Sequence, residues 1–177
     1  MQEKRTSGLS GRTIRTITVL GSCQASQAMA IAYDLFTDYE KPAAFAVLLK
    51  LIHEQDDHLD TGCLGARVIF HVLSAFGQAE LAYKMITRTD FPSYGHWVAA
   101  ENCTALFEAF LTPADSPNSK NHHFFGDVSS WFLKNLAGIK VNPYVRNANE
   151  VEISPEFISS LDYAEGEIGV PAGKVQV

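Results

Sequence analysis

The stretch GCLGARVIFHVLSAFGQAELAYKMIT, residues 62–87, decides the fold class. Two apolar stripes at helical spacing lie on either side of Gly77. The first stripe is made by Ile69, Val72, Leu73 and Phe76, and the second by Leu81, Ala82, Met85 and Ile86. A glycine directly after an apolar stripe is typical of a helix end. The stretch therefore predicts a helical hairpin, with helices at Cys63–Phe76 and Ala79–Thr87.

Similar hairpins are predicted on both sides of this stretch. Cys23, Cys63 and Cys103 follow one another at equal intervals of 40 residues, which is about the length of one helical hairpin in a repeat or toroid. Apolar periodicity, with Ser22 as an N-cap and Pro42 in a first turn, supports this spacing. The further helices are predicted at Ser22–Phe36, Pro42–Glu54, Thr104–Leu111 and Phe124–Leu136. The fold class is thus mainly α, with three helical hairpins.

The pattern changes after Gly138. Three short segments, Ile139–Val141, Val151–Ile153 and Lys174–Val177, alternate like β-strands, and the last has no partner after it. We therefore expect an irregular lead-in over residues 1–19, a helical domain over 20–138, and the start of a C-terminal β-domain over 139–177. A chain organised in this way is expected to be a fragment of a larger protein.

Composition excludes several classes of protein. The net charge of −6 argues against a nucleic-acid partner, which requires a basic face. No apolar run approaches the length of a membrane span, so no membrane partner is expected. The first residues lack the apolar core of a signal peptide, which predicts a cytoplasmic chain if Met1 is the natural start. Three cysteines do not make a disulfide framework.

Two motifs that suggest metal or phosphate chemistry do not meet its requirements. His53 and His58 lie five residues apart, so on a helix their imidazoles point to different sides and cannot share a metal ion. The segment Gly169–Lys174 is one residue short of a phosphate-binding loop. No metal site and no cofactor are therefore expected.

Polar and aromatic residues begin alternate predicted helices, at residues 22–27, 58–65 and 101–108. Alternate helices of an antiparallel array begin at the same end, so these segments are expected to meet at one rim, covered by the loops 89–101 and 112–123. The loops supply Tyr94, Trp97, Asn121, His122 and His123. Rings that stack on a sugar and polar groups that bind its hydroxyls are typical of a carbohydrate cleft. Periodicity alone favours a different interpretation, a solvated rim with ordinary helix caps.

Four segments carry a more specific pattern. His58-Leu-Asp-Thr-Gly-Cys-Leu-Gly65 is similar to His-Leu-x-Thr-Gly-x-Leu-Gly, and Asp90-Phe-Pro-Ser-Tyr-Gly95, preceded by Ala82-Tyr83, to Leu-Ala-Tyr…Tyr-Pro-Ser-Trp. Asn102-Cys-Thr-Ala-Leu-Phe-Glu108 is similar to Gly-Ala-Thr-Thr-x-Trp-Glu. Ser119-Lys-Asn-His-His-Phe-Phe-Gly126, continuing to Leu136-Ala-Gly-Ile139, is similar to Ser-x-Asn-His…Gly and Leu-Ala-Gly-Ile. In these motifs, and in their order, the chain resembles the inverting α-L-rhamnosidases of glycoside hydrolase family 78.

This resemblance implies a fold and a set of functional residues. It implies half of an (α/α)₆ toroid followed by a β-sandwich, and hydrolysis of terminal α-L-rhamnose with inversion. Glu108 matches the general base, and His122 matches a histidine that contacts the sugar. Trp97, Tyr94, Asn121 and Asp60 are further predicted substrate-binding residues. Phe107, Ala105 and Tyr94 depart from the family pattern of Trp, Thr and Trp, which puts the substrate preference in doubt more than the fold.

The general-acid segment of the family, of the type Asp-Cys-Pro-x-Arg-x-Glu, does not occur in this sequence. An inverting glycosidase requires two carboxyl groups on opposite sides of the scissile bond. One hypothesis is therefore the base-bearing half of a rhamnosidase, inactive alone and partnered by the missing N-terminal half of the toroid or by self-association. The alternative is a non-catalytic helical module for sugar binding or scaffolding.

Overall fold

The computed structural model describes residues 22–110, 119–142, 144 and 146–177. The predicted lead-in and residues 112–118 of the predicted loop lie outside these described residues. The helical part consists of α1 (Gln24–Ala32), α2 (Lys41–His53), α3 (Cys63–Ala75), α4 (Ala79–Thr87), α5 (Tyr94–Ala99), the 3₁₀ turn η1 (His123–Phe125), α6 (Asp127–Trp131) and the π-helical turn η2 (Phe132–Leu136). The strands are β1 (Ile139–Val141), β2 (Val151–Ile153), β3 (Glu167–Val170) and β4 (Gly173–Gln176). The mainly α fold with a short β-region is thus confirmed.

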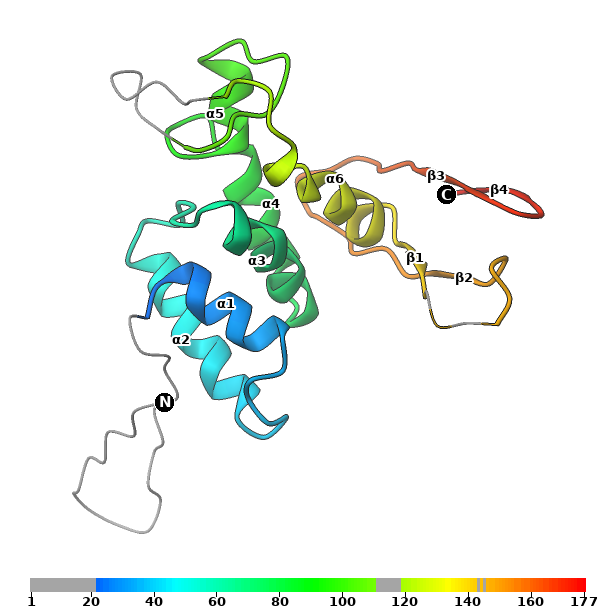
Figure 1. The fold of residues 1–177 in the computed structure, drawn as a ribbon, viewed down its shortest axis with the longest axis horizontal. Helices are drawn as coiled ribbons and strands as arrows, with labels where there is room; N and C mark the ends of the chain where they lie inside the picture. Colours follow the sequence, from blue (N-terminus) through cyan, green and yellow to red (C-terminus); the bar gives the residue numbers. More distant parts are fainter. Residues whose placement is uncertain (1–21, 111–118, 143, 145) are drawn as a thin grey trace.

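Helix α3 is the centre of the helical body. It contacts α1, α4, α6 and η1, and α1 packs in turn on α2 (Figure 1). Its inward side chains, Ile69, Phe70 and Leu73, are fully buried, because helices cover α3 on several sides. No helix among the described residues is long and apolar enough to cross a membrane.

The first two hairpins agree closely with the predicted ranges. Helix α3 ends where expected, because Gly77 takes a positive φ of 73° and the Gln78 N–H donates to the Leu73 carbonyl over 2.8 Å. Helix α1 ends earlier than predicted, since Asp34 adopts a left-handed conformation (φ 56°). Phe36 nevertheless remains buried against the core beyond the helix end.

The third hairpin differs from the prediction. Residues 104–110 are not helical, so the predicted helix at Thr104–Leu111 is wrong over the part that the structure describes. Helix α5 forms instead in the segment expected to be irregular, because the Ser93 side chain caps it by accepting the His96 N–H over 3.0 Å. Asn102, with φ 49°, turns the chain after α5, and the Cys103 N–H donates to the Trp97 carbonyl over 2.9 Å.

The predicted helix Phe124–Leu136 is present as three consecutive turns of different type, η1, α6 and η2. The Trp131 indole N–H donates to the Ser74 hydroxyl over 2.9 Å and ties α6 to α3. Gly138 ends the segment with φ 72°, and a Cβ there would lie 2.2 Å from the Pro155 nitrogen. Only glycine fits this position, as the sequence pattern indicated.

The β-region forms two separate antiparallel hairpins that project away from the helices (Figure 1). Strand β1 pairs with β2 in the register Ile139 to Ile153, and β3 pairs with β4 in the register Glu167 to Gln176. Strands occur only after residue 138 among the described residues, as predicted. The last strand, β4, pairs with the preceding strand β3, which was not predicted from the sequence.

Candidate active site

Two antiparallel backbone hydrogen bonds join the segments that carry the rhamnosidase-like motifs. The Glu108 N–H donates to the Ser119 carbonyl over 3.0 Å, and the His122 N–H donates to the Leu106 carbonyl over 2.8 Å. Both segments belong to the long connection between α5 and η1. This pairing places Glu108, Asn121 and His122 on adjacent chain segments, although residues 109–118 separate them in the sequence.

Glu108 is partly buried on this connection. Among the residues that the structure describes, no hydrogen bond or ion pair joins the Glu108 carboxylate to another group; an ionised carboxylate is an acceptor of hydrogen bonds. The sequence pattern predicted that Glu108 lies on a helix at Thr104–Leu111. That expectation is wrong over residues 104–110, because this segment is not helical.

The side chain of His122 is oriented by the turn that follows it. Its Nδ1 accepts the Phe124 N–H over 3.3 Å at the start of η1, which leaves Nε2 to carry the hydrogen. The imidazole also meets the Phe124 ring edge-on, with centroids 4.2 Å apart. His122 can therefore present a fixed N–H donor, while His123 stacks parallel to it at 5.3 Å.

Tyr94 and Trp97 lie below this connection, inside an aromatic layer. They are only 7% and 3% exposed, and Trp97 stacks on Phe110 with ring centroids 4.1 Å apart. The Tyr94 hydroxyl donates to the Phe125 carbonyl over 3.1 Å, and burial together with the charge of Asp127 raises the pKa of Tyr94. In this structure, neighbouring side chains thus cover most of both rings.

An apolar cavity of about 520 Å³ lies beside the aromatic layer. Tyr94, Trp97, Cys103 and Phe132 are among its lining residues. Burial, followed by the charge of Glu101, raises the pKa of the Cys103 thiol, so this cysteine is not activated as a nucleophile. Neither Glu108 nor His122 lines this cavity.

Asp60 is an exposed residue in the segment that precedes α3. The buried Gln24 side chain (1% exposed) holds its segment, by donating to the His58 carbonyl over 2.8 Å and accepting the Asp60 N–H over 3.0 Å. Segments 22–27 and 58–65 therefore meet, as expected from the alternate helix starts. No hydrogen bond or ion pair joins the exposed Asp60 to Glu108, Asn121 or His122.

An ion-pair network between the end of α2 and the end of α4 was not anticipated from the sequence. Arg88 donates to both Asp90 oxygens, over 2.9 and 2.7 Å, and His58 Nε2 lies 3.0 Å from the same carboxylate. The Arg88 hydrogen bonds lower the pKa of Asp90 well below its usual range. This network anchors the residues just before Ser93, the cap of α5.

His53 and His58 do not share a ligand. His53 Nδ1 lies 2.6 Å from Asp57, whereas His58 faces Asp90. Among the residues that the structure describes, no group of three or more His, Cys, Asp or Glu side chains could hold a metal ion.

The helical hairpins and the motif-bearing connection together define a class, the hairpin domains of six-hairpin glycosidases. Residues 6–136 match the model of the bacterial alpha-L-rhamnosidase 6 hairpin glycosidase domain. The chain therefore belongs to this family, which confirms the resemblance deduced from the four motifs.

Individual relatives agree with this membership. An alpha-L-rhamnosidase of Alteromonas sp. (strain LOR) is 31% identical over 161 residues, which are 87% of this chain and 17% of that protein. The solved α-L-rhamnosidase of Dictyoglumus thermophilum matches with a TM-score of 0.79 and 30% identity, over 88% of this chain and 17% of that one. The Streptomyces avermitilis enzyme, solved with L-rhamnose, matches with a TM-score of 0.76 and 27% identity, over 86% of this chain and 15% of that one. The chain thus spans about a sixth of the length of these relatives.

Proposed function

We propose that the chain is the base-bearing part of a glycoside hydrolase that releases terminal α-L-rhamnose with inversion. The observation that carries the proposal is the pairing of residues 106–108 with 119–122, which places Glu108 and His122 on two hydrogen-bonded segments of the same connection. Relatives named alpha-L-rhamnosidase that match most of this chain support the substrate class.

In this mechanism Glu108 is the general base. Its carboxylate takes a proton from a water molecule as that water attacks the anomeric carbon, opposite to the leaving aglycone. His122 donates its Nε2–H to a sugar hydroxyl, and its Nδ1 bond to Phe124 keeps it out of proton transfer. Asn121 and Asp60 are proposed as further polar contacts to the substrate.

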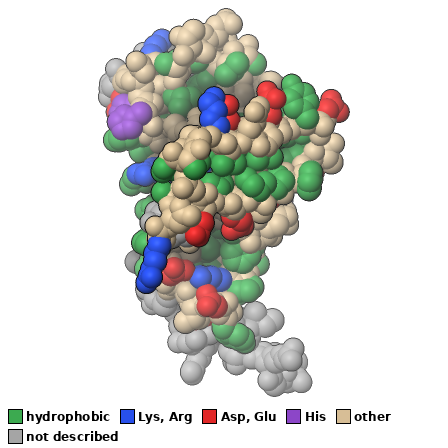
Figure 2. Space-filling model, turned by 90° about the vertical axis from the view of Figure 1, so that its right-hand side faces the viewer, with side chains coloured by type: hydrophobic (Ala, Val, Ile, Leu, Met, Phe, Trp, Pro, Cys, Tyr) green, Lys and Arg blue, Asp and Glu red, His purple; other side chains and the backbone are tan. Residues whose placement is uncertain are grey.

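The general acid belongs to a second segment, because the sequence of this chain matches only the base motif. The chain alone is therefore expected to be inactive, and its proposed partner is the acid-bearing half of a toroid. Large apolar side chains are exposed in the β-region, including Val141, Ile153 and Phe157, and Figure 2 shows apolar side chains gathered on that face. Such surface favours association with the partner or with a second copy.

A complementation assay tests the proposal. The chain is mixed with the N-terminal half of a homologous toroid and assayed with a chromogenic α-L-rhamnoside. We expect turnover only in the mixture, with β-L-rhamnose as the first product. Light scattering checks that the two halves associate; association without turnover contradicts the catalytic assignment.

The alternative function is sugar binding or scaffolding without catalysis. Coverage of the Tyr94 and Trp97 rings favours scaffolding within this alternative, since stacking on a sugar requires an open aromatic face. Binding of L-rhamnose by the associated halves, with no hydrolysis, would support this alternative.

A further inference from the structure

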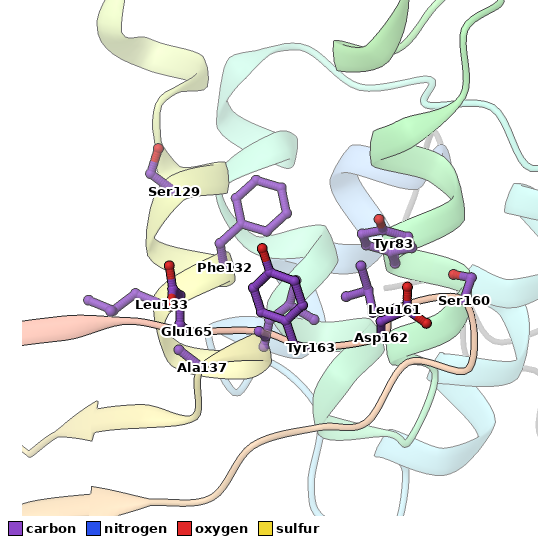
Figure 3. Close-up of a pocket in the computed structure, with 12 residues that line it drawn as sticks. Tyr83, Ser129, Phe132, Leu133, Ala137, Ser160, Leu161, Asp162, Tyr163 and Glu165 are labelled. Carbon is purple, nitrogen blue, oxygen red and sulfur yellow. The ribbon is translucent and has the colours of Figure 1, made fainter. Parts of the chain in front are cut away.

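A second cavity, of about 750 Å³, lies between the helices and the segment 160–165, far along the chain from Glu108 (Figure 3). Its wall comes from the π-helical turn η2 with Phe132, Leu133, Leu136 and Ala137, while Tyr83 projects from α4. The segment 160–165 closes the opposite side with Asp162, Tyr163 and Glu165. Single π-helical turns inside α-helical segments occur frequently at functional sites.

The cavity is formed in the free chain because its covering segment is anchored at both ends. Before the cavity, Ile158 is buried in the core, and the Glu156 N–H donates to the Asn135 carbonyl over 2.7 Å. The Ser159 N–H donates to the Glu80 carboxylate on α4. After the cavity, Gly166 lies so close to η2 that a Cβ would be 2.7 Å from the Ala137 Cβ. A preformed site loses little conformational entropy on binding.

The lining is divided into an apolar wall and a polar rim. Leu133, Leu136, Ala137 and Phe132 offer carbon surface. On the rim, the side-chain oxygens of Tyr83, Ser129, Ser160, Asp162, Tyr163 and Glu165 make no hydrogen bond to any residue that the structure describes. Figure 3 shows the rings of Phe132, Tyr163 and Tyr83 coming from three different elements around this space.

We propose that this cavity binds a 6-deoxyhexose residue of a glycoside, as a binding subsite separate from the Glu108 site. A 6-deoxy sugar carries a methyl group and an apolar C–H face, which suit the leucine wall and the aromatic rings. Its hydroxyls supply donors for Asp162 and Glu165 and acceptors for the tyrosine and serine hydroxyls. The choice of a 6-deoxy sugar rests on the proposed function, whereas the two-sided lining is a property of the cavity.

Calorimetric titration of the full chain tests the proposal with methyl α-L-rhamnoside and with methyl α-L-mannoside, which differs only by a hydroxyl on the sugar's C6. We expect the mannoside to bind about tenfold more weakly, because its extra hydroxyl meets the apolar wall. Tyr163→Ala should weaken rhamnoside binding by about threefold or more through lost ring contact. Tyr39→Ala is the matched control, since Tyr39 is 94% exposed and lies outside the cavity.

Each outcome decides a separate point. Unchanged rhamnoside affinity in Tyr163→Ala overturns the subsite, and so does equal affinity for both sugars. Preferential binding of tetramethylammonium would overturn it in favour of a cation site made by the carboxylates and rings. Loss of binding in Glu108→Gln alone would locate the sugar at the proposed active site, which overturns the subsite and leaves the proposed function standing.

Discussion

Helices α1–α4 and the connection from α5 to η1 use apolar residues in different ways. In α1–α4, apolar side chains recur at helical spacing and bury one stripe of each helix. In the connection, the rings of Phe107 and Phe110 both pack on Trp97 of α5, although the backbone that carries them is irregular. The first arrangement builds a scaffold, and the second holds loop residues such as Glu108 and His122 in place. The difference shows that an irregular segment can be held in place by ring packing and by backbone hydrogen bonds to another segment of the same chain.

The largest expected loss of stability tests whether Trp97 is part of a packed aromatic layer or of an open surface for sugar binding. Trp97→Ala should lower the free energy of unfolding by about 3–5 kcal/mol, because it removes a buried indole from between other rings. Urea denaturation measures this loss. Phe124→Ala, at a ring that is 47% exposed, is the control with a much smaller expected effect. A near-normal stability for Trp97→Ala would show that the aromatic layer does not hold the connection.

A second variant tests the scaffold itself. Leu73→Ala should cost about 2–5 kcal/mol, because Leu73 is fully buried where α3 meets its neighbours. The matched control Leu35→Ala removes an exposed leucine and should change stability by about 0.5 kcal/mol or less. Equal effects of the two substitutions would contradict the central place of α3.

A smaller loss of stability is expected at the start of α5, where the helices meet the connection. Ser93→Ala should lower stability by about 1–2 kcal/mol, since it removes the acceptor for the His96 N–H and a donor to the Arg88 and Asp90 carbonyls. Thr89→Ala, a nearby exposed position, serves as the control. If chemical denaturation finds the two variants equally stable, the cap does not explain why α5 forms.

The smallest effect is the pH dependence of the ion-pair network. The Arg88 hydrogen bonds lower the pKa of Asp90 in the folded state. The ionised Asp90 therefore stabilises the folded state at pH values above its unfolded-state pKa of about 3.9. This contribution is lost as the pH falls below about 4, through the lowered folded-state pKa. The stability difference between the wild type and Arg88→Gln should therefore narrow between about pH 5 and pH 2. Lys134→Gln makes the same charge change elsewhere, and an identical narrowing there would refute the local cause.

The scaffold could be predicted from the sequence because its signals are local. Apolar periodicity located α1–α4. Gly77 ends α3 with a positive φ that glycine adopts at no steric cost, and at Gly138 a Cβ would clash with the Pro155 backbone. The helix predicted at Thr104–Leu111 failed because Phe107 and Phe110 match a helical stripe but pack sideways on Trp97. The Glu108 N–H donates to the Ser119 carbonyl instead of to a carbonyl one helical turn earlier. Apolar periodicity gives no indication of this hydrogen bond.

The candidate site could be predicted only in part. Short motifs singled out Glu108 and His122 as proposed site residues, and the structure places them on two hydrogen-bonded segments. Exposure of Tyr94 and Trp97 could not be judged from residue type, because aromatic residues serve equally in cores and in clefts. Strand β3 was missed because Gly166 and Gly169 interrupt its alternation. The cavity beside η2 joins Tyr83 to residues about 80 positions later, which no local pattern records.

The most direct measurement for the central claim is the turnover of the complemented enzyme carrying Glu108→Gln. Glutamine keeps the shape and hydrogen bonding but cannot accept a proton, so turnover of a chromogenic rhamnoside should fall by about 10²–10⁴, with substrate binding largely retained. Added azide should restore the release of the aglycone and give a β-configured glycosyl azide, because a small anion can attack without a base. Near wild-type turnover in Glu108→Gln would contradict the assignment of Glu108 as the general base.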